Sequence, residues 1–159
     1  MNILRDTILV LAVTTSGLTA GLLAAFAYSV IPGLQRAGAA TAVSAMQRIN
    51  VAILNPLFAF IFFGSVVFGV VAAVIWWDDP LRWWLVAAAV LVVSAVLITV
   101  VINVPLNNRL NAAGAVSDAD APTAWAEFVR PWVRWNIIRA VAASTGFVVP
   151  IVGLLQTRS

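Results

Sequence analysis

The chain has 159 residues, of which 63% are hydrophobic and only 9% are charged, and its mean hydropathy is +1.04. A soluble domain of this size carries roughly a quarter charged residues, so the composition predicts an integral membrane protein. The net charge of +3 comes from nine arginines without any lysine. These arginines are scattered between apolar runs and form no basic stripe, so we expect no nucleic-acid partner.

The chain contains neither cysteine nor histidine. This excludes disulfides, thiol chemistry, the usual haem ligands and most transition-metal sites. All acidic residues lie outside the apolar runs, so a buried carboxylate site for a metal is not expected either. Catalysis would have to use arginine, amide, hydroxyl or indole side chains, or a bound organic cofactor.

Four apolar segments are long enough to cross a membrane, because about twenty helical residues span the hydrocarbon core. Their residues do not alternate between apolar and polar, which excludes a closed β-barrel. The first segment is too long for the core of a signal peptide and lacks a clear cleavage site, so we expect a retained span. The predicted spans are residues 8–31, ending at Pro32-Gly33; 51–77, ending at Asp78-Asp79-Pro80; 83–102; and 137–155.

The predicted fold class is therefore all-α, with a single integral membrane domain over residues 1–159 that forms a four-helix transmembrane bundle. In the loop before the fourth span, Asp120 and Pro122 indicate a helix start. Apolar residues then follow at helical spacing, which predicts a short amphipathic helix there. It could lie on the membrane or close over the bundle as a lid, and the sequence leaves both open.

Arginine counts favour the first and third loops as cytoplasmic, unless some of these arginines serve a site. We expect a multi-pass protein of the bacterial cytoplasmic membrane, with membrane lipid as a partner. Gly17 and Gly21 form a small-xxx-small pattern that allows close helix approach, which leaves a homo-oligomer open.

Most hydrogen-bonding side chains near the spans lie where the first span ends, the second begins, the third ends and the fourth begins. Because successive spans cross the membrane in opposite directions, these four places lie at the same membrane face. The side chains are Tyr28; Gln47, Arg48, Asn50 and Asn55; Asn103, Asn107 and Arg109; and Trp135, Asn136 and Arg139. Spacing places Asn103, Asn107 and Asn111 on one helix face, Gln47 and Asn50 on another, and Trp132, Trp135, Asn136 and Arg139 on a third. We therefore predict one polar pocket, in which Asn107, Gln47 or Asn50 lies within hydrogen-bonding range, directly or through water, of Asn136 or Arg139.

Arg139 is the strongest candidate for a site residue. It lies inside an apolar run, and no acid in the sequence lies at that depth. A buried unpaired arginine needs carbonyls, amides, water, a lipid phosphate or an anionic ligand. Simpler structural roles remain for others: Asn103 and Asn107 as helix caps around Pro105, and Gln47 and Asn50 as headgroup contacts.

Four short motifs occur in order along nearly the whole chain. They are an aromatic and a proline at the end of the first span (Tyr28, Pro32), Q-x-x-N (Gln47, Asn50), N-x-P-x-N (Asn103, Pro105, Asn107) and W-x-x-W-N-x-x-R (Trp132, Trp135, Asn136, Arg139). Together they resemble the anthrone-oxygenase-like family of small four-span membrane proteins.

That resemblance implies a cofactor-independent oxygenase, with no metal, that oxidises a hydrophobic, polyketide-derived aromatic such as an anthrone with O2. The catalytic residues would be Arg139, Asn136 and Asn107, which stabilise the developing oxyanion. The substrate-binding residues would be Trp135, Trp132, Tyr28, Gln47, Asn50 and Asn103. The proton acceptor stays open among Tyr28, an asparagine-held water, Glu127 and bulk water.

Two other functions fit the same sequence. One is a non-catalytic binder or carrier of a hydrophobic anion, with Arg139 as counter-ion. The other is a membrane scaffold subunit that pairs with another protein through Gly17 and Gly21. A transporter is disfavoured because inverted repeats and intramembrane acids are missing from the sequence.

Overall fold

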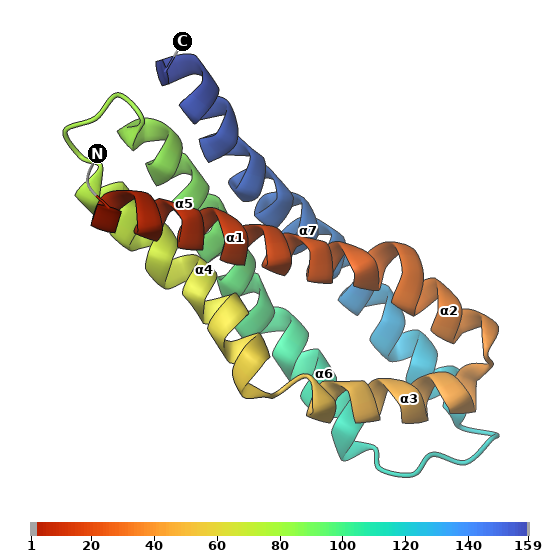
Figure 1. Cartoon of the computed structure of the whole chain (residues 1–159). Coiled ribbons are helices and arrows are strands. Elements are labelled where there is room, and N and C mark those ends of the chain that lie inside the picture. The colour runs from red at the N-terminus through yellow and green to blue at the C-terminus, as the bar shows by residue number, and fades with distance from the viewer. Residues whose placement is uncertain (1–2, 159) are drawn as a thin grey trace.

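The computed structural model describes residues 3–158, except for the side chain of Arg158, and this part of the chain is helical without strands (Figure 1). Its elements are α1 (Ile3–Ala25), η1 (Phe26–Val30), α2 (Ile31–Arg36), α3 (Ala39–Ala52), α4 (Pro56–Ile75), α5 (Arg82–Ile98), η2 (Thr99–Asn103), α6 (Val104–Ala112) and α7 (Ala121–Arg158). Four helical segments are long and apolar enough to cross a membrane: Ile3–Arg36, Pro56–Ile75, Arg82–Ala112 and Ala121–Thr157. The all-α, four-helix membrane bundle is confirmed, and the chain is a multi-pass integral membrane protein.

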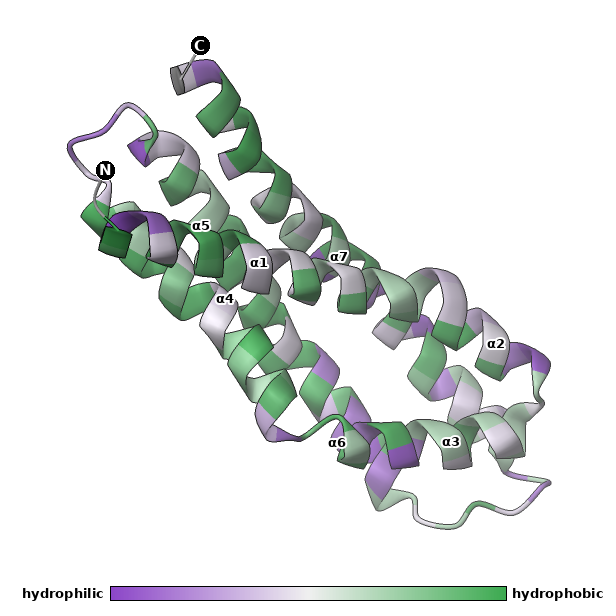
Figure 2. Ribbon diagram, in the orientation of Figure 1, coloured by the Kyte–Doolittle hydropathy of each residue, from purple (hydrophilic) through white to green (hydrophobic). Residues whose placement is uncertain are grey.

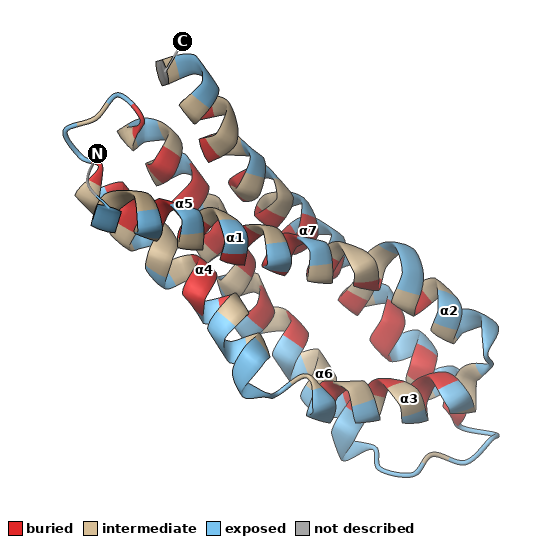
Figure 3. Cartoon of the chain, in the orientation of Figure 1, coloured by how far each residue is buried: buried red, intermediate tan, exposed pale blue. Residues whose placement is uncertain are grey.

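The four long helices form a ring, in which α1 packs on α4 and α7, and α5 packs on the same two helices. They lie close together at the end that carries both termini and spread apart toward the other end, where α3 crosses between α2 and α4 (Figure 1). Apolar residues cover the outside of the bundle (Figure 2). Buried residues face its interior (Figure 3). Large apolar side chains exposed on the outside of the helices are what a lipid environment requires.

Small residues bring the helices together. At Gly146 of α7 an added Cβ would lie 2.9 Å from Val92 Cγ2 on α5, and at Gly17 of α1 it would lie 2.9 Å from Phe147 Cε2 on α7. An added Cβ at Gly21 would meet nothing within 4 Å. Gly17 therefore already serves packing within the chain.

The first helix does not end at Pro32-Gly33 as expected but continues through α2 to Arg36. A proline inside an α-helix clashes with the carbonyl four residues earlier. Here the π-helix η1 precedes Pro32 and inserts a wider turn, which lets the helix pass the proline. The third span repeats this arrangement, with η2 directly ahead of α6 and its Pro105. In both places the proline lies two residues after the last π-helical residue.

The predicted second span differs at its start, because α3 and α4 are separate helices. The break ends at Asn55, whose Oδ1 accepts a hydrogen bond of 3.0 Å from the N–H of Phe58, and Pro56 opens the new helix. Gln47, Arg48 and Asn50 were expected in the second span and instead lie on α3.

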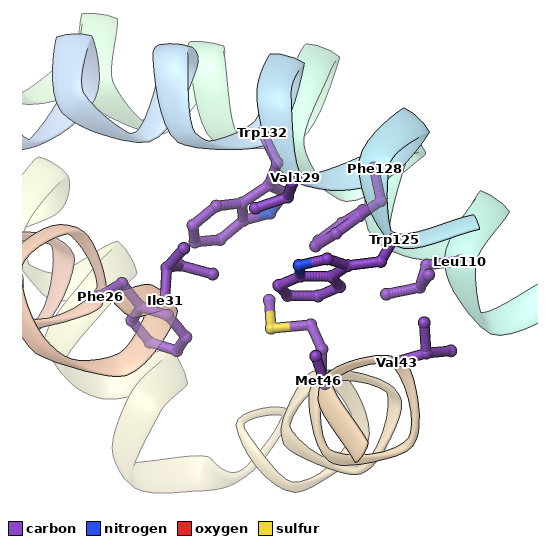
Figure 4. Close-up of a cluster of buried hydrophobic side chains, with 10 residues drawn as sticks. Phe26, Ile31, Val43, Met46, Leu110, Trp125, Phe128, Val129 and Trp132 are labelled. Atoms are coloured by element: carbon purple, nitrogen blue, oxygen red, sulfur yellow. The ribbon is translucent and has the colours of Figure 1, made fainter. Parts of the chain in front are cut away.

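The segment expected to form an amphipathic helix before the fourth span is helical, and it continues into that span as the single helix α7. Its apolar face is Trp125, Phe128, Val129 and Trp132, all buried. This face packs on Met46 and other residues of α3, η1 and α2 (Figure 4). Of the two alternatives left open by the sequence, packing on the bundle is the one observed.

Candidate functional site

Among the described residues, Arg139 is the charged residue that is buried inside the bundle. Arg139 is 5% exposed. Its Nε and Nη2 donate to Asn136 Oδ1 at 3.2 and 3.0 Å, and its Nη1 donates to Thr99 Oγ1 at 2.9 Å. Its Cζ lies 5.3 Å from the ring centroid of Trp132. Each of these partners is neutral, and among the described residues no carboxylate lies within ion-pair distance of Arg139.

The groups that hold Arg139 are themselves fixed by other helices. Asn136 is 0% exposed, and its Nδ2 donates to the carbonyl of Leu23 in α1 at 3.1 Å. Thr99 opens η2, and its hydroxyl donates to the carbonyl of Ala95 at 2.8 Å, which directs its free lone pairs toward Arg139. The guanidinium is thus clamped between α1, α5–η2 and α7.

Two donors of the guanidinium remain after these bonds. An arginine side chain has five N–H groups in a planar fork. Asn136 takes one from Nε and one from Nη2, and Thr99 takes one from Nη1. One N–H on each of Nη1 and Nη2 is therefore left without a described protein acceptor.

Arg139 lines a cavity of about 470 Å³ at the spread end of the bundle, which lies within the usual range for small-molecule sites. Most of the wall is apolar and aromatic, with Phe26, Phe58 and Phe62 among its members. The polar part of the wall comprises Arg139 and Thr99 together with Asn50, Asn55, Asn107, Asn108 and Asn111. Asn55, Asn108 and Asn111 are exposed and form an amide rim, whereas Arg139 and Thr99 are buried.

Several predicted site residues meet in or beside this cavity. Asn107, Asn50 and Trp132 line the same wall as Arg139. Trp132 Nε1 donates to Asn107 Oδ1 at 2.7 Å, and Asn50 Nδ2 donates to Asn111 Oδ1 at 3.2 Å. We predicted hydrogen bonds, directly or through water, from Asn107, Gln47 or Asn50 to Arg139 or Asn136. No direct one is described, and Asn107 and Asn50 share the cavity with Arg139 instead.

Besides Asn136, four other predicted residues lie outside the cavity wall. Tyr28 is 75% exposed on η1, and Trp135 is half-buried on α7. Gln47 Nε2 donates to the carbonyls of Leu110 and Gly114 at 2.8 and 2.9 Å, so it ties α3 to the end of α6. The fourth residue, Asn103, is discussed next.

Asn103 is fully buried behind Trp132. Its Nδ2 donates to the carbonyl of Trp132 at 3.2 Å, while its Oδ1 has no hydrogen-bond partner among the described residues. Asn103 and Asn107 thus share one helix face, as their spacing predicts, and that face meets Trp132.

Thr99 and the aromatic wall were missed by the sequence analysis. Thr99 lies four residues before Asn103, so extending the polar stripe of Asn103, Asn107 and Asn111 one step deeper would have found it. The phenylalanines of α4 carry no comparable signal, because every span is rich in apolar residues.

The arrangement can stabilise negative charge on an apolar ligand. Preorganised donors in a site shielded from water stabilise a developing oxyanion far more than the same donors do in water. The aromatic walls would hold a flat ring system.

Comparison with known proteins gives one family. The family model described as anthrone oxygenase matches residues 55–149, more than half of the chain. This range contains Thr99, Asn107, Trp132, Asn136 and Arg139, whereas Tyr28, Gln47 and Asn50 lie before it. No curated protein and no solved structure matches the chain.

Proposed function

The chain belongs to the anthrone oxygenase family, and from that premise we propose that it is a cofactor-independent membrane oxygenase. Its substrate is a hydrophobic, polyketide-derived aromatic of the anthrone type, and its membrane is the bacterial cytoplasmic membrane. The observation that carries the proposal is the buried Arg139. Among the described residues it has no acidic partner and no acceptor for two of its N–H groups, and it lines an aromatic cavity.

The reaction balances without a further redox group. The methylene carbon of the anthrone loses a proton, and the resulting enolate is aromatic. That carbanion carbon gives two electrons to O2 and forms a carbon–oxygen bond, which yields a hydroperoxide after protonation. Loss of water from the hydroperoxide forms the second carbonyl, so that anthrone and O2 become anthraquinone and water.

In this proposal Arg139 binds the enolate oxygen through the N–H groups on Nη1 and Nη2. Asn136 and Thr99 hold the guanidinium plane in position, and the aromatic wall orients the ring system. The enolate is bound more tightly than the neutral ketone because only the enolate carries the full negative charge, and this difference lowers the barrier to deprotonation.

The proton goes to water in this scheme. Tyr28 and Glu127 are exposed and lie outside the cavity wall. The groups at the rim are the amides of Asn55, Asn108 and Asn111, which can hydrogen-bond a water molecule next to the substrate.

The experiment measures O2 uptake and quinone formation by the purified protein in detergent, supplied with anthrone. Removal of one donor to an oxyanion typically lowers turnover by about 10²–10³-fold, so Arg139→Ala should approach the background of autoxidation. Arg139→Lys should also fail, because an ammonium group cannot reproduce the planar set of bonds to Asn136, Thr99 and substrate. Arg134→Ala is the matched control, since Arg134 is an exposed arginine of the same helix outside the cavity wall. Equal quinone formation by the wild type and Arg139→Ala would refute the proposal.

A carrier of a hydrophobic anion is the second candidate. It is favoured by one observation, namely that the described cavity wall contains no carboxylate or phenol that could accept the proton. A carrier would bind the anion without turnover, and Arg139→Lys would retain most of the affinity because the charge is kept.

A further inference from the structure

The edges of the cavity differ in chemistry, and the difference bears on how a ligand enters. Toward α3 and α6, the edge of the cavity is polar, and hydrogen bonds between amides and carbonyls join the two helices there. Gln47 Nε2 donates to Leu110 O at 2.8 Å and to Gly114 O at 2.9 Å, and Asn50 Nδ2 donates to Asn111 Oδ1 at 3.2 Å. These bonds hold α3 across the spread end of the bundle (Figure 1).

The edge between α4 and the η2–α6 segment is apolar. Phe63 on α4, Val100 on η2 and Val104 on α6 all line the cavity, yet they are 52%, 51% and 38% exposed. All three belong to helices that are long and apolar enough to cross a membrane. Side chains that face a cavity and are also exposed within such helices mark an opening from the cavity toward lipid.

This edge is also weakly held together. α4 packs along α1 and α5, whereas the hydrogen bonds of Asn55 at the start of α4 stay local, to Ala52, Ile53 and Phe58. No described hydrogen bond joins α4 to η2 or α6, and the bond from Thr19 Oγ1 to Ile61 O at 3.3 Å lies on the α1 side of α4. The backbone groups of both helices stay paired within their own helices.

We propose that the cavity is filled laterally from the bilayer, through the opening formed by Phe63, Val100 and Val104. The ligand enters as a neutral, membrane-dissolved aromatic molecule and becomes an anion only beside Arg139. An anion would have to leave water to cross this apolar edge, which is strongly unfavourable, whereas a neutral apolar molecule crosses from lipid at little cost. The identity of the ligand rests on the proposed function, but the route does not.

The test uses the natural absence of cysteine from the chain. Met46 on α3 lines the cavity and is 1% exposed, so Met46→Cys places a single thiol inside it. The protein is reconstituted in phosphatidylcholine–phosphatidylglycerol vesicles. Labelling rates are compared for lipid-soluble N-(1-pyrenyl)maleimide and for a membrane-impermeant, positively charged methanethiosulfonate.

Narrowing the opening should slow labelling from the lipid. We expect Val100→Trp and Val104→Trp to lower the rate with the pyrenyl reagent at least about tenfold, equal to roughly 1.4 kcal/mol of barrier. Val101→Trp is the matched control, because Val101 is 66% exposed on the same helix but does not line the cavity. The charged reagent should react slowly until Gln47→Ala removes the bonds that hold α3 to α6.

Two results would overturn the route. One is labelling by the charged reagent as fast as that of an exposed reference thiol, Asn108→Cys, which would show entry from water. The other is an unchanged pyrenyl rate in the tryptophan variants, or no labelling by either reagent. Ile49→Cys, also in the cavity wall, replaces Met46→Cys if that variant does not fold. Labelling needs no turnover, so a failure of the oxygenase proposal and a failure of the lateral route give different results.

Discussion

Replacing Asn136 by aspartate separates the charge of Arg139 from its position. Asn136 Oδ1 accepts from Nε at 3.2 Å and from Nη2 at 3.0 Å, and a carboxylate oxygen would accept both bonds equally well. The variant loses the donor to Leu23 O, which is worth about 1 kcal/mol, and gains an ion pair. We therefore expect the melting temperature of Asn136→Asp to remain close to that of the wild type.

The effect on the ligand should be much larger. An oxyanion bound to Nη2 at about 2.8 Å lies within roughly 6 Å of the acceptor oxygen at position 136, since that oxygen is 3.0 Å from the same nitrogen. At an effective dielectric constant of about 20, two negative charges at that separation repel by ~3 kcal/mol. This corresponds to about a hundredfold loss in affinity or in kcat/KM.

The assay compares kcat/KM for quinone formation and the melting temperature in detergent for three variants. Asn136→Asp should lose activity and keep stability. Asn136→Ala should lose both, because buried charged donors are left unpaired at about 1.5–3 kcal/mol for each bond. Asn111→Asp, an amide-to-acid change at the exposed rim, should change little because solvent screens it. Wild-type kcat/KM in Asn136→Asp would show that no ligand uses the positive charge of Arg139.

Substitutions at three further positions, each with its expected outcome, test neighbouring contacts. Thr99→Val keeps the shape of the side chain but removes the acceptor for Nη1. The transition-state free energy obtained from kcat/KM should rise by ~1.5–3 kcal/mol, and Thr99→Ser should restore the wild-type value. Equal activity of the two variants would contradict this role. Trp132→Phe keeps an aromatic ring in the core but loses the 2.7 Å bond to Asn107. The free energy of unfolding, measured by denaturation in mixed micelles, should fall by about 1 kcal/mol. An unchanged free energy of unfolding would mean that water replaces the bond. Gly146→Ala should destabilise by about 1–3 kcal/mol, because its Cβ would lie 3.2 Å from the backbone oxygen of Ala88. A Cβ added at Gly69 would meet nothing within 4 Å, so the free energy of unfolding of Gly69→Ala should be unchanged or higher by up to ~1 kcal/mol in the same denaturation assay. A reversed order of the two glycine variants would contradict the packing argument.

The all-α class and the four membrane spans could be predicted from sequence because membrane insertion depends on local hydrophobicity, and each span carries its own signal. The importance of Arg139 was predictable for a similar reason, since a lone charge in an apolar run is expensive wherever the run packs. The common helix face of Asn103 and Asn107 followed from their spacing, whereas their shared partner Trp132 did not.

Tertiary features were less accessible to the sequence analysis. The prolines at positions 32 and 105 were read as helix ends or as sites next to caps, since nothing in the local sequence signals that a π-helix will carry the chain past them. The position of Gln47 depended on whether α3 and α4 are one helix or two, which is decided by the cap at Asn55. Trp135 shares a stripe with Asn136 and Arg139 in the sequence, but it is half-buried and is not part of the cavity wall.

The π-helix η2 also sets the rotational phase between two parts of the cavity. It accommodates one residue more than an α-helical turn, and each residue of an α-helix turns the chain by about 100°. Thr99, which meets Arg139, lies at the start of this turn, and Asn107, which meets Trp132, lies beyond it. Deletion of a single residue within η2 would rotate all of α6 relative to α5, so that the contacts of Thr99 and of Asn107 with α7 could not both be kept. The cavity is therefore sensitive to the length of this segment as well as to its composition, and changes in length rather than substitutions should be the more damaging ones here.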